Sequence, residues 1–242
     1  MKRIIVSLVI AMAALGAAPG QVAEDLLDYE VVAVKRHLLL VTDGNELKLQ
    51  PGDHAQSGDS LRTGSRSSAD LHIADRAASF HIGTKTRFHL AHGTPGVLID
   101  IERGSIRAIF GKLPEGDDSE RLVTTPSAVL AVRGTEYGLE VEKDGDTTLM
   151  VFEGTVEVRD LLGRSEPVLV GAGLSTRIRT GREPSAPSAH GISTTDWDRG
   201  QRSERPNWSG GQQTPAMGNQ PQQGGAGSQS PSSQGGSKQH GG

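Results

Sequence analysis

The sequence predicts an all-β fold of short stacked strands, arranged either as a β-solenoid-like stack or as a jelly roll or sandwich, followed by a disordered C-terminal tail. Three observations indicate this fold class. Apolar and polar residues alternate with period two between residues 28 and 182. Turn signals such as Asp43-Gly44, Gly58-Asp59 and Asp144-Gly145 separate these runs at short intervals. No segment in this range has the 3.6-residue period of an amphipathic helix, and strands at this spacing are typical of sandwiches and solenoids.

The first element along the chain is a predicted signal peptide over residues 1–20. Lys2 and Arg3 precede an apolar run, residues 4–18, that is rich in small side chains. This run is shorter than the roughly 20 residues that a membrane-spanning helix needs, so a cleaved signal is favoured over a permanent anchor. We therefore expect a periplasmic or secreted protein with no stable membrane span. The chain has no cysteine, so an exported domain must depend on an ordinary hydrophobic core.

The strand-forming runs follow, over a predicted domain at residues 25–182. Tyr137, Leu139 and Val141 alternate with acidic residues, which is typical of a strand with one buried face. Residues 38–41 and 149–152 are apolar throughout, which favours central strands that are covered on both sides. From residue 183 onward proline and then Gly, Gln and Ser dominate, and such a composition buries too little apolar surface to fold. We therefore expect residues 183–242 to be a flexible tether.

Several segments of this predicted domain resemble the FecR domain family. The resemblance extends over about residues 38–178 and begins with LKLQPGD at residues 47–53 and GDSLRTG at residues 58–64. Its most specific part is the ordered series VTTP at 123–126, AVRGTEY at 131–137 and VFEGTV at 151–156. Asp75-Arg76 replaces the Asp-Gly turn usual in the family, so a longer or bulged turn is expected there.

The resemblance implies a signalling domain that acts outside the cytoplasm. In the full-length FecR regulators that the domain resembles, a cytoplasmic anti-sigma segment and one membrane span precede this domain. Here only Lys2 and Arg3 stand before the apolar run of the predicted export signal, so we expect the anti-sigma segment to be lacking and do not expect direct contact with a sigma factor. The expected protein is a stand-alone exported FecR-like domain.

The candidate binding residues are those of the family motif, Arg133, Gly134 and Thr135. An arginine fork can recognise a partner through paired hydrogen bonds. The alternative is a structural arginine that ties loops together through backbone carbonyls or a carboxylate. Gly134 is expected to supply a bulge or a close backbone approach.

Three recurring tripeptides suggest a second candidate site, in which His72, His81 and His89 each lie between two large apolar residues. If the three strands are adjacent, alternation places all three imidazoles on one outer face, where they could share zinc, copper or nickel or respond to pH. The alternative is that outward histidines are simply tolerated there. A cupin-like enzyme would need histidines inside a barrel, whereas this alternation points them outward.

Catalytic and nucleic-acid signatures are absent from the sequence. It has no Gly-x-Ser-x-Gly, Ser-x-x-Lys or His-Glu-x-x-His motif, and its net charge of -4 is spread without a basic patch. The leading interpretation is a non-enzymatic binding and signalling module of the bacterial cell envelope, without a cofactor, whose partner is an envelope protein or a glycan. The alternative is a periplasmic protein that binds a divalent transition metal through the three histidines.

Overall fold

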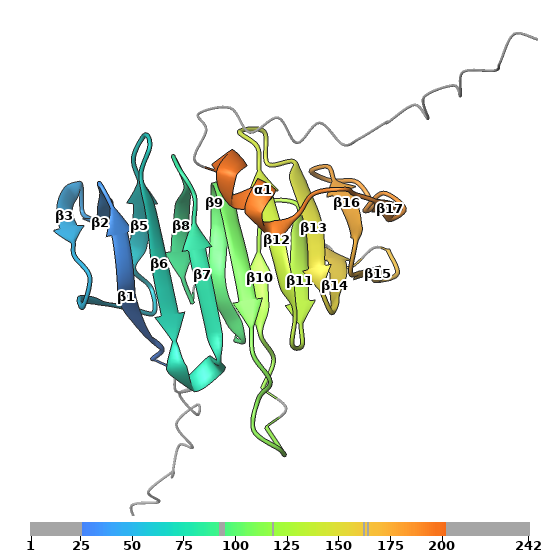
Figure 1. The fold of residues 1–242 in the computed structure, drawn as a ribbon, viewed down its shortest axis with the longest axis horizontal. Helices are drawn as coiled ribbons and strands as arrows, with labels where there is room; N and C mark the ends of the chain where they lie inside the picture. Colours follow the sequence, from blue (N-terminus) through green and yellow to red (C-terminus); the bar gives the residue numbers. More distant parts are fainter. Residues whose placement is uncertain (1–25, 92–94, 118, 162, 164, 202–242) are drawn as a thin grey trace, which may run out of the picture. The chain divides into compact units, whose positions relative to one another are not determined.

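The computed structural model describes residues 26–91, 95–117, 119–161, 163 and 165–201; the predicted signal peptide and the predicted tail from residue 202 lie outside this part. The strands of the described residues form two sheets, A and B, that share one long strand, β9 (Val97–Phe110) (Figure 1). Neighbouring strands are antiparallel except for β9 and β10, which are parallel. The all-β prediction is confirmed.

Sheet A has the spatial order β4-β1-β6-β7-β9-β12-β13-β16-β17. Its strands other than β9 are β1 (Asp28–Lys35), β4 (His54–Gln56), β6 (Ser68–Ile73), β7 (Ala78–Ile82), β12 (Glu136–Val141), β13 (Thr147–Glu153), β16 (Leu174–Ile178) and β17 (Ser188–Ala189). The turn between β6 and β7 is the 3₁₀ helix η1 (Ala74–Arg76), followed by Ala77 in a left-handed conformation. This is the longer turn that the Asp75-Arg76 sequence predicts.

Sheet B has the spatial order β3-β2-β5-β8-β9-β10-β11-β14-β15. Its strands other than β9 are β2 (Leu38–Thr42), β3 (Asn45–Leu49), β5 (Ser60–Thr63), β8 (Arg87–Leu90), β10 (Leu122–Thr124), β11 (Ala128–Val132), β14 (Thr155–Asp160) and β15 (Val168–Gly171). The chain passes repeatedly from one sheet to the other and advances along both. The structure thus combines the cross-section of a sandwich with the stepwise progression of a solenoid.

Strand β9 changes sheets at Gly104. Residues up to Arg103 pair with β8 in sheet B, and residues from Gly104 pair with β12 in sheet A. Gly104 has a φ of +107°, and a Cβ there would lie 2.4 Å from Thr86 Oγ1. The Ser105 amide donates to that same oxygen at 3.1 Å, which fixes the bend. Only glycine fits this close, left-handed approach of two backbones.

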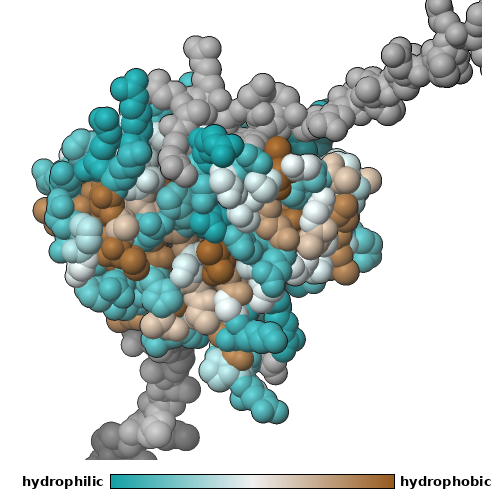
Figure 2. Space-filling model, in the orientation of Figure 1, coloured by the Kyte–Doolittle hydropathy of each residue, from teal (hydrophilic) through white to brown (hydrophobic). Residues whose placement is uncertain are grey.

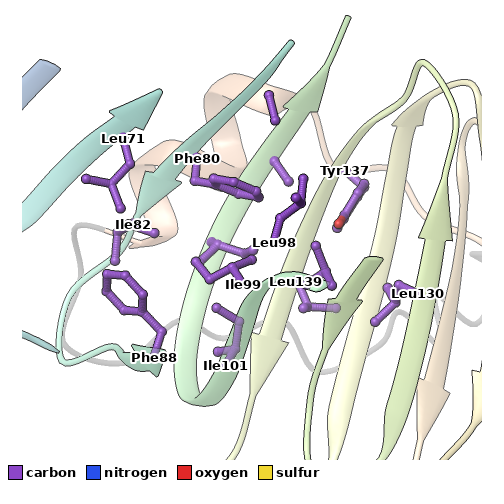
Figure 3. Close-up of a cluster of buried hydrophobic side chains, with 14 of the residues drawn as sticks. Leu71, Phe80, Ile82, Phe88, Leu98, Ile99, Ile101, Leu130, Tyr137 and Leu139 are labelled. Atoms are coloured by element: carbon purple, nitrogen blue, oxygen red, sulfur yellow. The ribbon is translucent and has the colours of Figure 1, made fainter. Parts of the chain in front are cut away.

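The inner faces of the two sheets form one hydrophobic core (Figure 3). Phe80 and Tyr137 enter it from sheet A, and Phe88 and Leu130 enter it from sheet B. All four are at most 1% exposed. The alternation that predicts Tyr137, Leu139 and Val141 as buried is confirmed, since the intervening acidic residues face outward.

The described structure continues past the predicted domain boundary at Arg182, into residues 183–201, for which the sequence predicts a disordered tail. Residues 188–201, here called the C-terminal strap, contain β17, which extends the edge of sheet A, and the helix α1 (Thr194–Gln201), which lies against the outer face of sheet A (Figure 1). Trp197 of α1 is fully buried there and packs edge-on against Phe152 of β13. Burial of this indole stabilises a segment whose composition otherwise favours disorder.

Gly138 of β12 creates the space for Trp197, because a Cβ at this position would lie 2.5 Å from the indole Cε2. Arg107 of β9 adds an ion pair, donating from Nε and Nη2 to Asp198 at 2.9 and 3.1 Å. The strap also accounts for the second buried face of residues 149–152 in β13. Residues 38–41 in β2 have no such cover and are only half-buried beyond Leu38.

Candidate functional site: an arginine-lined groove

The predicted binding residues 133–135 connect β11 in sheet B to β12 in sheet A. Arg133 is exposed, Gly134 has a φ of +66°, and Thr135 is 2% exposed. The Thr135 carbonyl accepts a hydrogen bond from the Phe110 amide at 2.9 Å. The close backbone approach expected at Gly134 occurs at Gly154, where a Cβ would lie 2.7 Å from the Gly134 carbonyl oxygen. The motif is therefore a corner between sheets that presents Arg133 at the surface.

Arg133 lines a groove of about 330 Å³ next to this corner, which we call the arginine-lined groove. One wall is the segment before β10, which contributes Asp117, Ser119 and Arg121. Strand β11 contributes Ala131 and Val132 to the other wall, and Leu113 and Leu122 add apolar surface. The groove thus combines apolar surface with two guanidinium groups and with the carboxylates of Asp117 and Glu120.

Arg121 is the buried cation of this groove, at 2% exposure. Its Nη1 donates to the carbonyl oxygens of Gly111 at 2.8 Å and Arg76 at 3.3 Å, and its guanidinium lies 5.2 Å from the Phe110 ring centroid. Its Nε has no hydrogen-bond partner among the described residues. Burial lowers the pKa of Arg121; the charge of Asp117 offsets part of this effect, and the charge of Arg133 adds to it. Such a guanidinium gains from an acceptor brought into the groove.

Arg121 ties two loops together through carbonyls, a structural role of the kind that the sequence offers as one alternative for Arg133. The sequence does not single out Arg121, because a single arginine before an apolar run carries no recognisable pattern.

Asp117 is a carboxylate on the rim of the groove. Hydrogen bonds from the Ser119 hydroxyl and amide hold the pKa of Asp117 below its usual range, and the charges of Arg76 and Arg121 add to this effect. Asp117 is therefore ionised and already engaged at neutral pH. The residues that line the groove include no histidine or lysine, so the arrangement is suited to binding through charge and shape rather than to proton transfer.

The three histidines of the second candidate site do not share one face. His72 and His81 lie on β6 and β7 in sheet A, whereas His89 lies on β8 in sheet B. The prediction fails because β8 pairs with β5 and β9 and not with β7. Over the described part of the chain, no group of three His, Asp or Glu side chains is arranged to hold a metal ion.

Each histidine instead has a side-chain partner nearby. His72 Nδ1 lies 3.0 Å from Ser79 Oγ, and His81 Nδ1 lies 2.5 Å from Asp70 Oδ1. His89 lies between Ser60 Oγ, 2.7 Å from Nδ1, and Glu102 Oε1, 2.6 Å from Nε2. These contacts cross neighbouring strands, as is usual for polar pairs on an outer sheet face.

Comparison with known proteins finds one family model that matches part of the chain. The model of the FecR protein family matches residues 59–157, a narrower range than the 38–178 expected from sequence. Two crystal structures of a proposed anti-sigma factor from Parabacteroides distasonis ATCC 8503, at 2.50 and 1.65 Å resolution, resemble the chain with a TM-score of 0.44 and 14% identity. Each match covers 54% of this chain and 59% of the other, so the likeness spans less than two thirds of those proteins.

No curated protein matches the chain in sequence. Among the described residues no helix is both long and apolar enough to cross a membrane. The family match runs from the turn before β5 into β14 and includes the crossover at residues 133–135. The match of the FecR family model over residues 59–157 supports a signalling or regulatory role.

Proposed function

We propose that this protein is an exported, non-enzymatic binding and signalling module of the bacterial cell envelope. Its partner is an envelope protein that inserts an acceptor group, a carboxylate or a backbone carbonyl, into the arginine-lined groove. The FecR domain supports the signalling role, and the predicted signal peptide at residues 1–20 supports export.

The observation that carries this proposal is the pairing of an exposed and a buried arginine in one groove. Arg133 is accessible to a partner, and Arg121 keeps a buried Nε–H without an acceptor among the described residues. A buried donor that lacks a partner costs free energy, and a ligand oxygen would recover it. Leu113 and Val132 add apolar surface to the lining, which a docked partner would bury around such a contact.

Scattered apolar residues elsewhere give less reason to expect a partner. The large exposed apolar side chains are Leu26, Val32, Leu47, Ile109, Leu161 and Leu169, and they come from strands and loops spread along the chain. On the face shown in Figure 2, apolar residues form separate patches among polar ones. Single exposed apolar residues are normal on a protein surface.

The binding proposal is tested by affinity capture from detergent-solubilised envelopes of the native bacterium, using the tagged full-length chain and quantitative mass spectrometry. The test variant is Arg133→Ala, and the matched control is Arg179→Ala, at another exposed arginine. We expect one envelope protein to be enriched by the wild type and the control, with at least about tenfold less captured by Arg133→Ala. Equal capture by all three proteins, or capture of no envelope protein, would refute the role of the groove.

Export is tested separately by fractionating cells that express the chain with a C-terminal epitope. Removal of residues 1–20 should retain the protein in the cytoplasm, whereas the intact chain should appear in the periplasm or medium at a mass reduced by signal cleavage. An intact, uncleaved chain confined to the cytoplasm would overturn this part of the proposal.

A further inference from the structure

Three arginines face one another across adjacent strands of sheet B. Arg62 of β5 is paired in register with Arg87 of β8, which in turn is paired with Arg103 of β9. We call these three residues the arginine row. Directly opposed residues have Cβ atoms about 4.5–5.5 Å apart, and like charges at this separation destabilise a sheet. The row therefore has an electrostatic cost that the fold alone does not explain.

All three side chains of the row lie on the outer face of sheet B. Leu61 precedes Arg62 and Phe88 follows Arg87, and both are at most 1% exposed and point into the core. At Arg103 the register shifts, because Arg87 pairs with Arg103 while Phe88 pairs with Ile101. This β-bulge directs Arg103 outward just before the bend at Gly104, so the position of its guanidinium depends on a fixed backbone feature.

The carboxylates nearby neutralise only part of this charge. Glu46 accepts two hydrogen bonds from Arg62, at 2.9 and 2.8 Å. Glu102 is shared between Arg87, at 3.6 Å, and His89, at 2.6 Å. The side chain of Arg103 has no hydrogen bond or ion pair within the described residues.

A hollow of about 140 Å³ lies among these side chains, and we call it the anion pocket. It is lined by all three arginines of the row, and Lys85 supplies a fourth cation. Lys85 stands in the tight turn between β7 and β8 with a φ of +54°, and its ammonium likewise has no partner within the described residues. At about 30 Å³ per water, the 140 Å³ of the pocket corresponds to between four and five water volumes, which is enough for a tetrahedral oxyanion.

A larger hollow of about 640 Å³ adjoins the pocket, since Lys85 and Arg103 line both. Its lining also includes an acidic wall, formed by the carboxylates of Glu140, Glu142 and Asp144, with Lys143 beside them. Carboxylates beside cations disfavour a ligand that is anionic throughout, but they accept hydrogen bonds from hydroxyl groups. The two hollows together therefore suit a molecule with one anionic group and a neutral, hydroxyl-rich body.

We propose that the anion pocket binds the phosphate monoester of a phosphorylated sugar, with Arg103 and Lys85 holding the phosphate and the sugar hydroxyls facing the acidic wall of the larger hollow. Arginine forks match phosphate oxygens through paired hydrogen bonds, and a dianion offsets the repulsion along the row. This site lies apart from the arginine-lined groove, because the two share no lining residue.

The test is isothermal titration calorimetry on the full-length chain in low-salt buffer, with glucose 6-phosphate, inorganic phosphate and glucose as separate probes. Glucose 6-phosphate should bind with a dissociation constant below about 1 mM, inorganic phosphate more weakly, and glucose not measurably. Vesicles of phosphatidylcholine with phosphatidic acid present the same group on a lipid and should bind no better than vesicles of phosphatidylcholine alone.

The test variant is Lys85→Gln/Arg103→Gln, and Arg179→Gln/Arg182→Gln removes the same charge at exposed positions elsewhere. The first should weaken glucose 6-phosphate binding at least about tenfold, and the second should leave it within about twofold. Because Lys85→Gln/Arg103→Gln relieves like-charge repulsion, its Tm should not fall, so lost binding cannot be attributed to unfolding.

Four results would overturn the proposal. They are no binding of glucose 6-phosphate by the wild type, equal weakening by both double variants, equal affinity for inorganic phosphate and the sugar phosphate, and selective binding of the phosphatidic acid vesicles.

Discussion

Gly138→Ala should release the C-terminal strap from sheet A while the sandwich stays folded. The new Cβ would lie 2.5, 2.6 and 2.8 Å from the Cε2, Cδ2 and Cζ2 atoms of Trp197. Real Cβ contacts are longer than these, and an indole is rigid, so the ring must leave its position on β12. Phe152 and Arg107 also contact the strap, but each of them does so through a single side chain.

The size of the effect follows from the surface that Trp197 buries. A tryptophan buries about 150–250 Å², which at about 25 cal/mol/Å² corresponds to about 4–6 kcal/mol as an upper bound. Loss of a contact of this size should shift the strap to the open state.

Two measurements follow the opening of the strap. In a Trp208→Phe background, the emission of Trp197 should shift to the red in Gly138→Ala, because the indole moves from a buried site into water. Hydrogen exchange of residues 188–201 should become fast, whereas residues 128–132 in β11 should remain protected. Gly171→Ala is the matched control, since a Cβ at Gly171 meets nothing within 4 Å. Unchanged emission and protection in Gly138→Ala would refute the proposed steric role of Gly138.

Four further substitutions test the sandwich, at Glu140, Tyr137, Tyr29 and Gly104. Burial, reinforced by a neighbouring carboxylate, raises the pKa of Glu140 from 4.5 to about 7. The native state therefore binds an extra proton between these pH values and loses stability as the pH rises through this range. In urea unfolding, Glu140→Gln should be more stable than wild type by on the order of 2 kcal/mol at pH 8, but not at pH 4. Tyr137→Phe should raise the free energy of unfolding by about 1–3 kcal/mol, since the buried Tyr137 hydroxyl has no partner among the described residues. Tyr29→Phe should instead lower the free energy of unfolding, because the Tyr29 hydroxyl donates to the Leu98 carbonyl oxygen at 2.5 Å. Gly104→Ala should lower the free energy of unfolding by at least about 3 kcal/mol, and with it the Tm, because the new Cβ would lie 2.5 Å from the Cα of Thr86. A calorimetric Tm within a degree of wild type would contradict this account of the bend.

The strand content could be predicted from the sequence because it depends on local pattern. Alternation over residues 136–142 specifies which side chains of β12 face the core, whatever the strand order. That β8 belongs to sheet B could not be predicted in the same way. Residues 83–86 carry the chain from sheet A to sheet B, and nothing in Gly83-Thr84-Lys85-Thr86 states which sheet follows. His89 therefore shares the local pattern of His72 and His81 but lies on the other sheet.

The strap was missed for a different reason, although a local signal existed. Ser193 caps α1, since its hydroxyl oxygen accepts the Asp196 amide at 3.2 Å, and the Ser-x-x-Asp spacing is that of a capping box. Ile192 and Trp197 have the spacing of a hydrophobic staple across this cap. The Gly-, Pro- and Ser-rich composition of this region favours a disordered tail in spite of these two local signals. In addition, the space for the indole depends on Gly138, which is far from Trp197 in sequence. Arg121 and the arginine row also depend on pairings between distant strands, which composition does not reveal.

The strap and the anion pocket should act independently, although β9 contributes an arginine to each. Arg107 holds the strap on sheet A, and Arg103 lines the pocket on sheet B. Between them Ser105 is 3% exposed, and its amide and carbonyl are both bonded to Thr86 Oγ1, at 3.1 and 3.2 Å. A backbone fixed in this way should not transmit strap opening to the pocket, because distant sites without shared partners have additive effects. Gly138→Ala should therefore leave the affinity for glucose 6-phosphate within about twofold of wild type, measured by the same calorimetric titration. A change of tenfold or more would mean that the bend at Gly104 couples the two faces, and that the strap regulates the pocket.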